Sequence, residues 1–199
     1  MKKRLILIML PFFSLCVNAY IPDVVETSSG QQLATGNILI ASKSITDGIF
    51  NKTVILLTHY DQDGAAGLII NRPSKSSLKE AIPDLVYDDK TRLLFIGGPV
   101  QRAVLSVLIK TKNDRKDLTR VVGNIYHGLG SRRLIDNTGQ YFSSDSEDIR
   151  FYSGYAGWGK GQLEAEIKGG GWHTIDVNPE HLFDMDFDSM WEVLIQKVQ

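Results

Sequence analysis

A stretch rich in glycine and aromatic residues near the C-terminus, residues 151–172, constrains the fold more than any other part of the chain; it reads FYSGYAGWGKGQLEAEIKGGGW. Large and aromatic side chains at residues 150–153 favour a strand. The glycines that follow, at positions 154, 157, 159 and 161, permit positive φ angles and close backbone approach, and they exclude a helix. The pattern predicts a buried strand that ends in a tight turn at these glycines.

A short helix over residues 162–168 is expected directly after that turn. Leu163 and Ile167 are four residues apart, so they share one face and should pack inward. Glu164 and Glu166 are two residues apart and diverge around the helix, so they cannot form a catalytic pair, and each is interpreted as a solvated charge. A run of three glycines then ends the helix.

The N-terminus has the pattern of a secretory signal peptide. Three basic residues at positions 2–4 precede an apolar run of 13 residues, and the small residues Val17 and Ala19 stand at −3 and −1 of a cut before Tyr20. A membrane anchor needs about 20 apolar residues, so this run is too short for one. We predict that residues 1–19 are removed between Ala19 and Tyr20, that the protein is periplasmic or secreted, and that only the transient signal peptide meets a membrane.

Removal of the signal peptide changes the chemistry available to the mature chain. It takes away the only cysteine, Cys16, and three of the 22 basic residues while all 23 acidic residues remain, which leaves a formal charge of −4. Leu15 stands where a lipoprotein site has Gly or Ala, so Cys16 is interpreted as part of the apolar run. Disulfides, thiolate catalysis and cysteine metal sites are thereby excluded. A negative chain repels phosphate backbones, so no nucleic-acid partner is expected.

The composition, 43% hydrophobic and 23% charged over 199 residues, indicates an ordinary globular domain, placed at residues 33–199 after a flexible lead-in at residues 20–32. Two strands joined by the turn Asp61–Gly64 form the best hairpin, and short connections between other strands favour a mixed sheet over a purely parallel one. Expected strands are residues 37–41, 53–58, 65–70, 92–96, 103–109, 124–127 and 172–177; expected helices are 77–82, 131–135 and a C-terminal amphipathic helix with Met190, Trp191, Leu194 and Val198 on one stripe.

Several short motifs resemble, in their order and spacing, the bacterial YqgE/AlgH family over residues 33–198. They are ILIA at 38–41, GLIINRP at 67–73, GGPV at 97–100, GYAGW at 154–158, GQLEAEI at 161–167, Trp172 and Trp191. The resemblance implies an α+β fold in which a mixed β-sheet bends into a pseudo-barrel flanked by helices. It implies no established enzymatic activity and no cofactor.

The chain departs from the family pattern in three places. Lys160 and Lys43 stand where the family usually has proline, so those two turns are expected to be looser. The third departure is the signal peptide, because typical members look cytoplasmic. The family's association with transcriptional control of exopolysaccharide synthesis could not operate by direct DNA contact from outside the inner membrane.

A glycine-rich segment before a helix, Gly157–Gly161, invites comparison with phosphate-binding loops, since backbone N–H groups at a helix N-terminus bind anions. Gln162 occupies the place of the Ser or Thr that would hold magnesium, and the glycine spacing is wrong. A structural turn is therefore the favoured interpretation.

His59, Asp61 and Asp63 alternate along the chain as if to present one face, and an imidazole with carboxylates could hold a divalent metal or serve a hydrolase. The segment lacks the remaining ligands of a calcium loop, so an acidic hairpin turn is favoured and these three residues are only weak metal candidates. Other histidines, His127, His173 and His181, fit no metal motif, and no serine-nucleophile elbow occurs.

Arg72 follows a strand that should be buried, so its guanidinium is expected to turn inward, more often into a structural salt bridge than onto a ligand. Tyr155 and Trp158 stand among glycines and could line a pocket, although core packing is the default.

Three functional hypotheses follow. The first is an exported, non-enzymatic protein that binds an unknown protein partner or small ligand. The second is an uncharacterised hydrolase that uses His59 with Asp61, and the third is a transcriptional regulator by family association. The surface proposed for the first hypothesis comprises Asn71, Arg72, Gly97, Gly98, Tyr155, Trp158 and Gln162.

Overall fold

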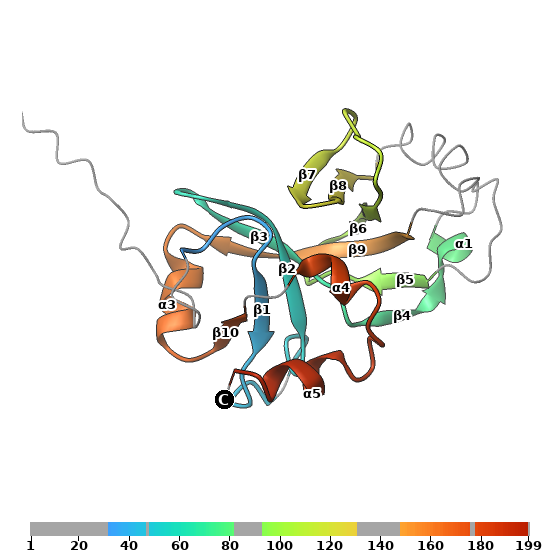
Figure 1. The fold of residues 1–199 in the computed structure, drawn as a ribbon. Helices are drawn as coiled ribbons and strands as arrows, with labels where there is room; N and C mark the ends of the chain where they lie inside the picture. Colours follow the sequence, from blue (N-terminus) through green and yellow to red (C-terminus); the bar gives the residue numbers. More distant parts are fainter. Residues whose placement is uncertain (1–31, 47, 82–92, 131–147, 176–177, 199) are drawn as a thin grey trace, which may run out of the picture.

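A computed structural model of the chain describes residues 32–46, 48–81, 93–130, 148–175 and 178–198. Within these residues the fold is α+β: a ten-stranded, mostly antiparallel sheet carries a few short helices (Figure 1). The strands are β1 Ile38–Ala41, β2 Val54–Asp61, β3 Gly64–Ile69, β4 Pro73–Ser77, β5 Leu93–Ile96, β6 Val100–Lys110, β7 Thr119–Val122, β8 Ile125–Leu129, β9 Asp148–Gly159 and β10 Trp172–Ile175.

The main path of the sheet runs β10-β1-β2-β3-β9-β6-β8-β7, and β5 joins β4 to β9. All pairs are antiparallel except β5 with β9, so the sheet is mixed, as predicted. The predicted hairpin is confirmed as β2–β3, and β2 begins with five consecutive buried residues. Over the described strands the sheet is not closed into a barrel, so the bend into a pseudo-barrel implied by the family resemblance is not confirmed.

The glycine and aromatic stretch corrects one prediction. Gly154, Gly157 and Gly159 form no tight turn, because β9 runs through them as one strand of 12 residues. Its first half pairs with β5 and β6, and its second half pairs with β3. Of these three glycines, only Gly154 has a positive φ, at 70°, and the strand continues through it. The turn itself falls at Gly161, whose φ is 72°.

Gly154 lies opposite an irregularity in β6. Val100 pairs with Tyr155 and Leu105 pairs with Ser153, so the residues between them bulge out of the ladder. The bulge carries Gln101 with a positive φ of 47°, and its side chains are exposed. A β-bulge of this kind bends the strand and redirects its side chains.

The helices are α1 Leu78–Ala81, α3 Gln162–Lys168, α4 Pro179–Leu182 and α5 Met190–Ile195. Helix α1 begins with a reciprocal cap in which the Glu80 N–H donates to Ser77 Oγ and the Ser77 N–H donates to Glu80 Oε2. Helix α5 lies across the end of β1 (Figure 1), where the Trp191 indole N–H donates to the Ala41 carbonyl. It buries Met190, Trp191 and Leu194, as predicted, but it ends at Ile195, so the predicted stripe member Val198 lies beyond it. The predicted helix at 131–135 lies outside the described residues, as do the signal peptide and all but the last residue of the lead-in.

The core has a large and a small part. The large cluster joins β1, β2 and β3 to β9, α3 and α5. The small one lies on the other side of β5 and β6 and comprises Leu78, Leu94, Val107, Ile109, Ile149 and Phe151. No helix in the described part of the chain is long and apolar enough to cross a membrane.

Candidate functional site

Two adjoining hollows open on the face of the sheet opposite α3, between the β2–β3 hairpin and the β7–β8 pair, both of which lie toward the top of Figure 1. The first, the β3–β9 hollow, has a volume of about 470 Å³, and the second, the β8 hollow, about 570 Å³. His59, Ala66 and Tyr155 line both. We call the two together the groove.

The groove exists because the two residues at its base, Ala66 and Gly157, have almost no side chain to fill it. Ala66 of β3 pairs directly with Gly157 of β9, so the two residues share one face of the ladder. The next rung, Ala65 with Trp158, points to the opposite face and is buried. A methyl group and a hydrogen therefore stand where larger side chains would fill the space.

Tyr155 forms one wall of the groove, and its ring explains why residue 157 is a glycine. A Cβ added at Gly157 would lie 3.1 Å from Tyr155 Cε2, so the tyrosine ring lies across the glycine. Gly157 does not have a positive φ. Crowding by the aromatic ring, not backbone conformation, is what favours glycine there.

His59 and Asp61 form the opposite wall. The His59 Nε2 atom lies 2.9 Å from Asp61 Oδ2, and Asp61 Oδ1 accepts the Asp63 N–H at 2.8 Å. That backbone hydrogen bond, helped by His59, lowers the pKa of the Asp61 carboxyl. The His59 side chain is 62% exposed, so the pair lies in solvent at the groove's edge.

The β8 hollow adds two polar groups that the sequence did not single out. Ser106 of β6 is 5% exposed, and His127 of β8 is partly buried. Burial lowers the pKa of His127 from 6.5 to about 4, so its imidazole is neutral at pH 7. Leu68, Val104, Leu118 and Leu129 supply the apolar part of the remaining lining, and Thr58, Gln101 and Thr119 add further polar side chains.

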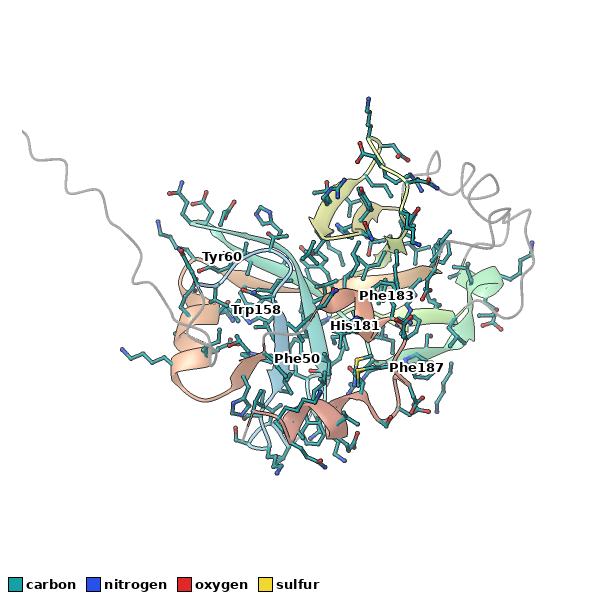
Figure 2. All side chains as sticks on the ribbon, viewed as in Figure 1. Phe50, Tyr60, Trp158, His181, Phe183 and Phe187 are labelled. Carbon is teal, nitrogen blue, oxygen red and sulfur yellow. The ribbon has the colours of Figure 1, made fainter. Side chains whose placement is uncertain are left out.

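The opposite face of the same strands is covered by α3, and there the prediction for Glu164 and Glu166 is wrong. Glu166 Oε2 accepts the indole N–H of Trp158 at 2.9 Å and that of Trp172 at 2.8 Å. Glu164 Oε1 accepts the Tyr60 hydroxyl at 2.6 Å; burial first, and then this hydrogen bond, raise the pKa of Tyr60. Neither glutamate is a freely solvated charge, because each accepts a hydrogen bond from a buried or partly buried aromatic side chain. Two of these donors, Tyr60 and Trp158, are labelled in Figure 2.

Trp158 is therefore core, as the default interpretation held. Its side chain is 7% exposed, and its ring packs edge-to-face with Trp172 at a centroid distance of 6.0 Å. Gln162 also serves the fold, because it accepts the Gly159 N–H and donates to Glu166. Its place at the start of α3 stabilises the turn at Gly161.

Asn71 and Arg72 have structural partners. The Asn71 amide accepts the Val54 N–H and donates to the Lys52 carbonyl. The Arg72 guanidinium does turn inward, but it donates to the Ile49 and Asn51 carbonyls at 2.6 and 2.7 Å, and among the described residues it forms no salt bridge. Burial lowers its pKa. Neither residue lines the groove.

Gly97 and Gly98 allow two chain segments to touch. A Cβ at Gly97 would lie 2.3 Å from the Gly154 carbonyl oxygen, and one at Gly98 would lie 2.1 Å from the Tyr155 carbonyl carbon. Both distances are far below van der Waals contact, so only glycine fits against β9. Of the predicted surface, only Tyr155 and Trp158 line the groove, and the Trp158 side chain turns to the other face, where it donates to Glu166. The β3–β9 hollow adds His59, Asp61 and Asp63.

No group of three or more His, Cys, Asp or Glu side chains among the described residues is arranged to hold a metal ion. His59, Asp61 and Asp63 come close in space as a hydrogen-bonded turn, and the geometry gives the metal alternative no support.

The fold and the groove together define a class: α+β proteins built on a largely antiparallel sheet with one open, concave face. The chain belongs to the AlgH-like family, whose model matches residues 38–199. The resemblance seen in the short sequence motifs is thereby confirmed.

Relatives and solved structures agree with this assignment. A UPF0301 protein of Chlorobaculum tepidum is 35% identical over 168 residues, covering 83% of this chain and 87% of the relative, and one of Chlorobium luteolum is 34% identical over 163 residues, covering 81% and 84%. The solution structure of the AlgH protein of Pseudomonas aeruginosa superposes with a TM-score of 0.66 at 28% identity, covering 80% of this chain and 86% of that one. A crystal structure from Corynebacterium diphtheriae, at 22% identity, has a TM-score of 0.65 over 84% and 88% of the chains and shows the same fold.

Proposed function

We propose that the protein is a non-enzymatic binding protein that holds a small ligand in the groove. One observation carries the proposal: at the Ala66–Gly157 rung one face of the ladder carries only a methyl group and a hydrogen, and His59, Asp61 and Tyr155 line the hollow around it. A concave surface with apolar walls and a few convergent polar groups is the usual form of a ligand site. The binding surface proposed here is therefore the groove, not the region of Asn71, Arg72, Gly97 and Gly98.

The hydrolase hypothesis is the alternative, and one observation speaks for it: His59 is held by Asp61, as a general base is held by an orienting carboxylate. In the described part of the chain no hydroxyl group hydrogen-bonds to His59, and the imidazole stands largely in solvent. A nucleophile and its base need hydrogen-bond reach of one another. Binding without chemistry is the simpler use of this surface.

The cellular location of the protein is part of the proposal. Export through the predicted signal peptide would place the groove outside the inner membrane, where it would meet periplasmic or secreted molecules. A net charge of −4 on the mature chain argues against a nucleic-acid partner, and with it against a regulator that contacts DNA.

A groove-filling substitution tests the proposal. Ala66→Leu places a larger side chain on the shared floor of both hollows, while Ala165→Leu makes the same change on the exposed face of α3. A library of small organic fragments is screened against both variants and the unmodified protein by ligand-observed NMR. We expect a set of fragments whose binding is lost in Ala66→Leu and retained in Ala165→Leu. If no fragment distinguishes the two variants, the groove is not a binding site.

A further inference from the structure

The Ser106 hydroxyl is a buried polar group with nothing to bond. Its residue is 5% exposed, and Oγ has no hydrogen-bond partner among the described residues. The residue lines the β8 hollow. A buried hydroxyl without a partner costs free energy, and replacing it by an apolar group is often neutral or stabilising. Such a group, retained at the wall of a hollow, indicates a bond made to something that enters the hollow.

The β6–β8 ladder brings a second polar side chain to the same face. Ser106 pairs with Leu129 and Leu108 pairs with His127, so Ser106 and His127 are diagonal neighbours on adjacent strands. Side chains two residues apart on a strand share a face, which puts both groups on the hollow's side of the sheet. The neutral imidazole of His127 offers one donor and one acceptor.

The charge around the β8 hollow excludes some ligands. The one carboxylate that lines it, Asp117, accepts two hydrogen bonds from the Arg115 guanidinium, at 3.1 and 3.0 Å. No Lys or Arg among the described residues lines either hollow. An anion would therefore enter without a cationic partner and a cation without a free carboxylate, and each would lose its hydration in a largely apolar space.

We propose that the β8 hollow binds an uncharged small molecule with an apolar body and one neutral polar group, such as a primary amide or a hydroxyl, which hydrogen-bonds to Ser106 Oγ. The apolar body lies against Leu68, Val104, Leu118 and Leu129, of which Val104 and Leu129 are exposed to solvent. A primary amide both donates and accepts, so it can bond to Ser106 and to His127 together. The inference rests on the proposed function, because it names the ligand class of the same groove.

Three probes that differ only in their polar group test this: hexanamide, hexanoate and hexylamine, titrated at pH 7 by protein-observed NMR against the full chain as recovered after expression. We expect hexanamide to bind at least about threefold more tightly than either ion, with shifts at Ser106, His127 and Leu129. Ser106→Ala should weaken hexanamide about three- to tenfold, the loss of one hydrogen bond to a neutral partner.

Ser153→Ala is the matched control. Ser153 lies on the neighbouring strand β9, and its hydroxyl already donates to the Arg102 carbonyl of β6 at 2.6 Å. We expect this variant to lose stability in urea unfolding and keep its hexanamide affinity, whereas Ser106→Ala keeps or gains stability and loses affinity.

Equal affinity of Ser106→Ala and the unmodified protein would overturn the inference. So would tighter binding of hexanoate or hexylamine, or no binding of hexanamide at all. These outcomes leave the proposed function standing if fragments sensitive to Ala66→Leu are found. If none is found, both fail together.

Discussion

Glu166 on α3 holds two tryptophans from two strands, and its removal should be far more costly than a surface glutamate's. The indole N–H groups of Trp158 and Trp172 both donate to Oε2, at 2.9 and 2.8 Å, and the two side chains are only 7% and 4% exposed. Glu166→Ala leaves both donors buried without this acceptor. A hydrogen bond to a charged group contributes about 1.5–3 kcal/mol.

Two such bonds would contribute about 3–6 kcal/mol to the free energy of unfolding. Glu166 is partly exposed, however, so water can take over part of the hydrogen bonding that the carboxylate provides. We therefore expect Glu166→Ala to lower the free energy of unfolding by about 3 kcal/mol, a large part of the roughly 5–15 kcal/mol typical of a domain. Glu166→Gln keeps one acceptor oxygen and should cost less.

The assay is equilibrium urea unfolding followed by circular dichroism and tryptophan fluorescence. Glu192→Ala on α5 is the control, because Glu192 pairs with Lys52 at 3.1 Å with both side chains about half exposed, and such surface pairs contribute about 0–1 kcal/mol. In a double-mutant cycle, Trp158→Phe should cost less in the Glu166→Ala background than alone. If Glu166→Ala costs no more than Glu192→Ala, the carboxylate does not hold the tryptophans and the reasoning fails.

Three further predictions concern other parts of the chain. Burial lowers the pKa of His127 from 6.5 to about 4, so between these pH values the unfolded state binds more protons than the folded state. The free energy of unfolding should therefore fall as the pH drops from 6.5 to 4, by at most about 3 kcal/mol. Urea titrations of His127→Gln over the same pH range should show a shallower fall. Identical pH dependence would contradict this. Gly154 has a φ of 70°, and a Cβ there would lie 2.6 Å from the Gly98 carbonyl oxygen, so Gly154→Ala should lower the free energy of unfolding by at least about 2 kcal/mol. Gly170 has a φ of 76° but open space around it, so Gly170→Ala should lower it clearly less in the same assay. Intact-mass measurement of protein from a periplasmic fraction should show that residues 1–19 are absent; a cytoplasmic protein that retains Met1 would refute export.

The sequence predicted those elements whose cause is local. The β2–β3 hairpin follows from the turn at Asp61–Gly64 between two apolar runs, and α3 and α5 follow from their apolar stripes and from the glycines beside α3. Strand β4 at Pro73–Ser77 was missed because it is polar and largely exposed, and β7 at Thr119–Val122 was missed because it is only four residues long with two polar, exposed positions. Both strands pair with a neighbour that the local sequence does not indicate. The continuation of β9 through its glycines was also missed, because glycine disfavours strands locally and the strand is held there by its pairing with β3.

The groove was harder to predict than the fold. Tyr155 stood out because it is an aromatic residue among glycines, but Ser106 lies in an ordinary strand and His127 seemed isolated. Their neighbourhood comes from the β6–β8 register, which joins residues that no spacing rule connects. The signal that could have found Ser106 is weak: a serine within an otherwise apolar run, Leu105 to Ile109.

The sheet's closing pairs have a consequence for how the chain acquires its structure. The first strand, β1, has β10 as its outer neighbour, so residue 38 pairs with residue 175, and β3 pairs with the end of β9. Topologies dominated by such distant pairings fold slowly, because loop-closure entropy must be overcome before the contacts form. A growing chain cannot complete this sheet until nearly all of it has been synthesised. Until then β1 lacks its β10 partner and β3 lacks its β9 partner, so both strands keep an unpaired edge.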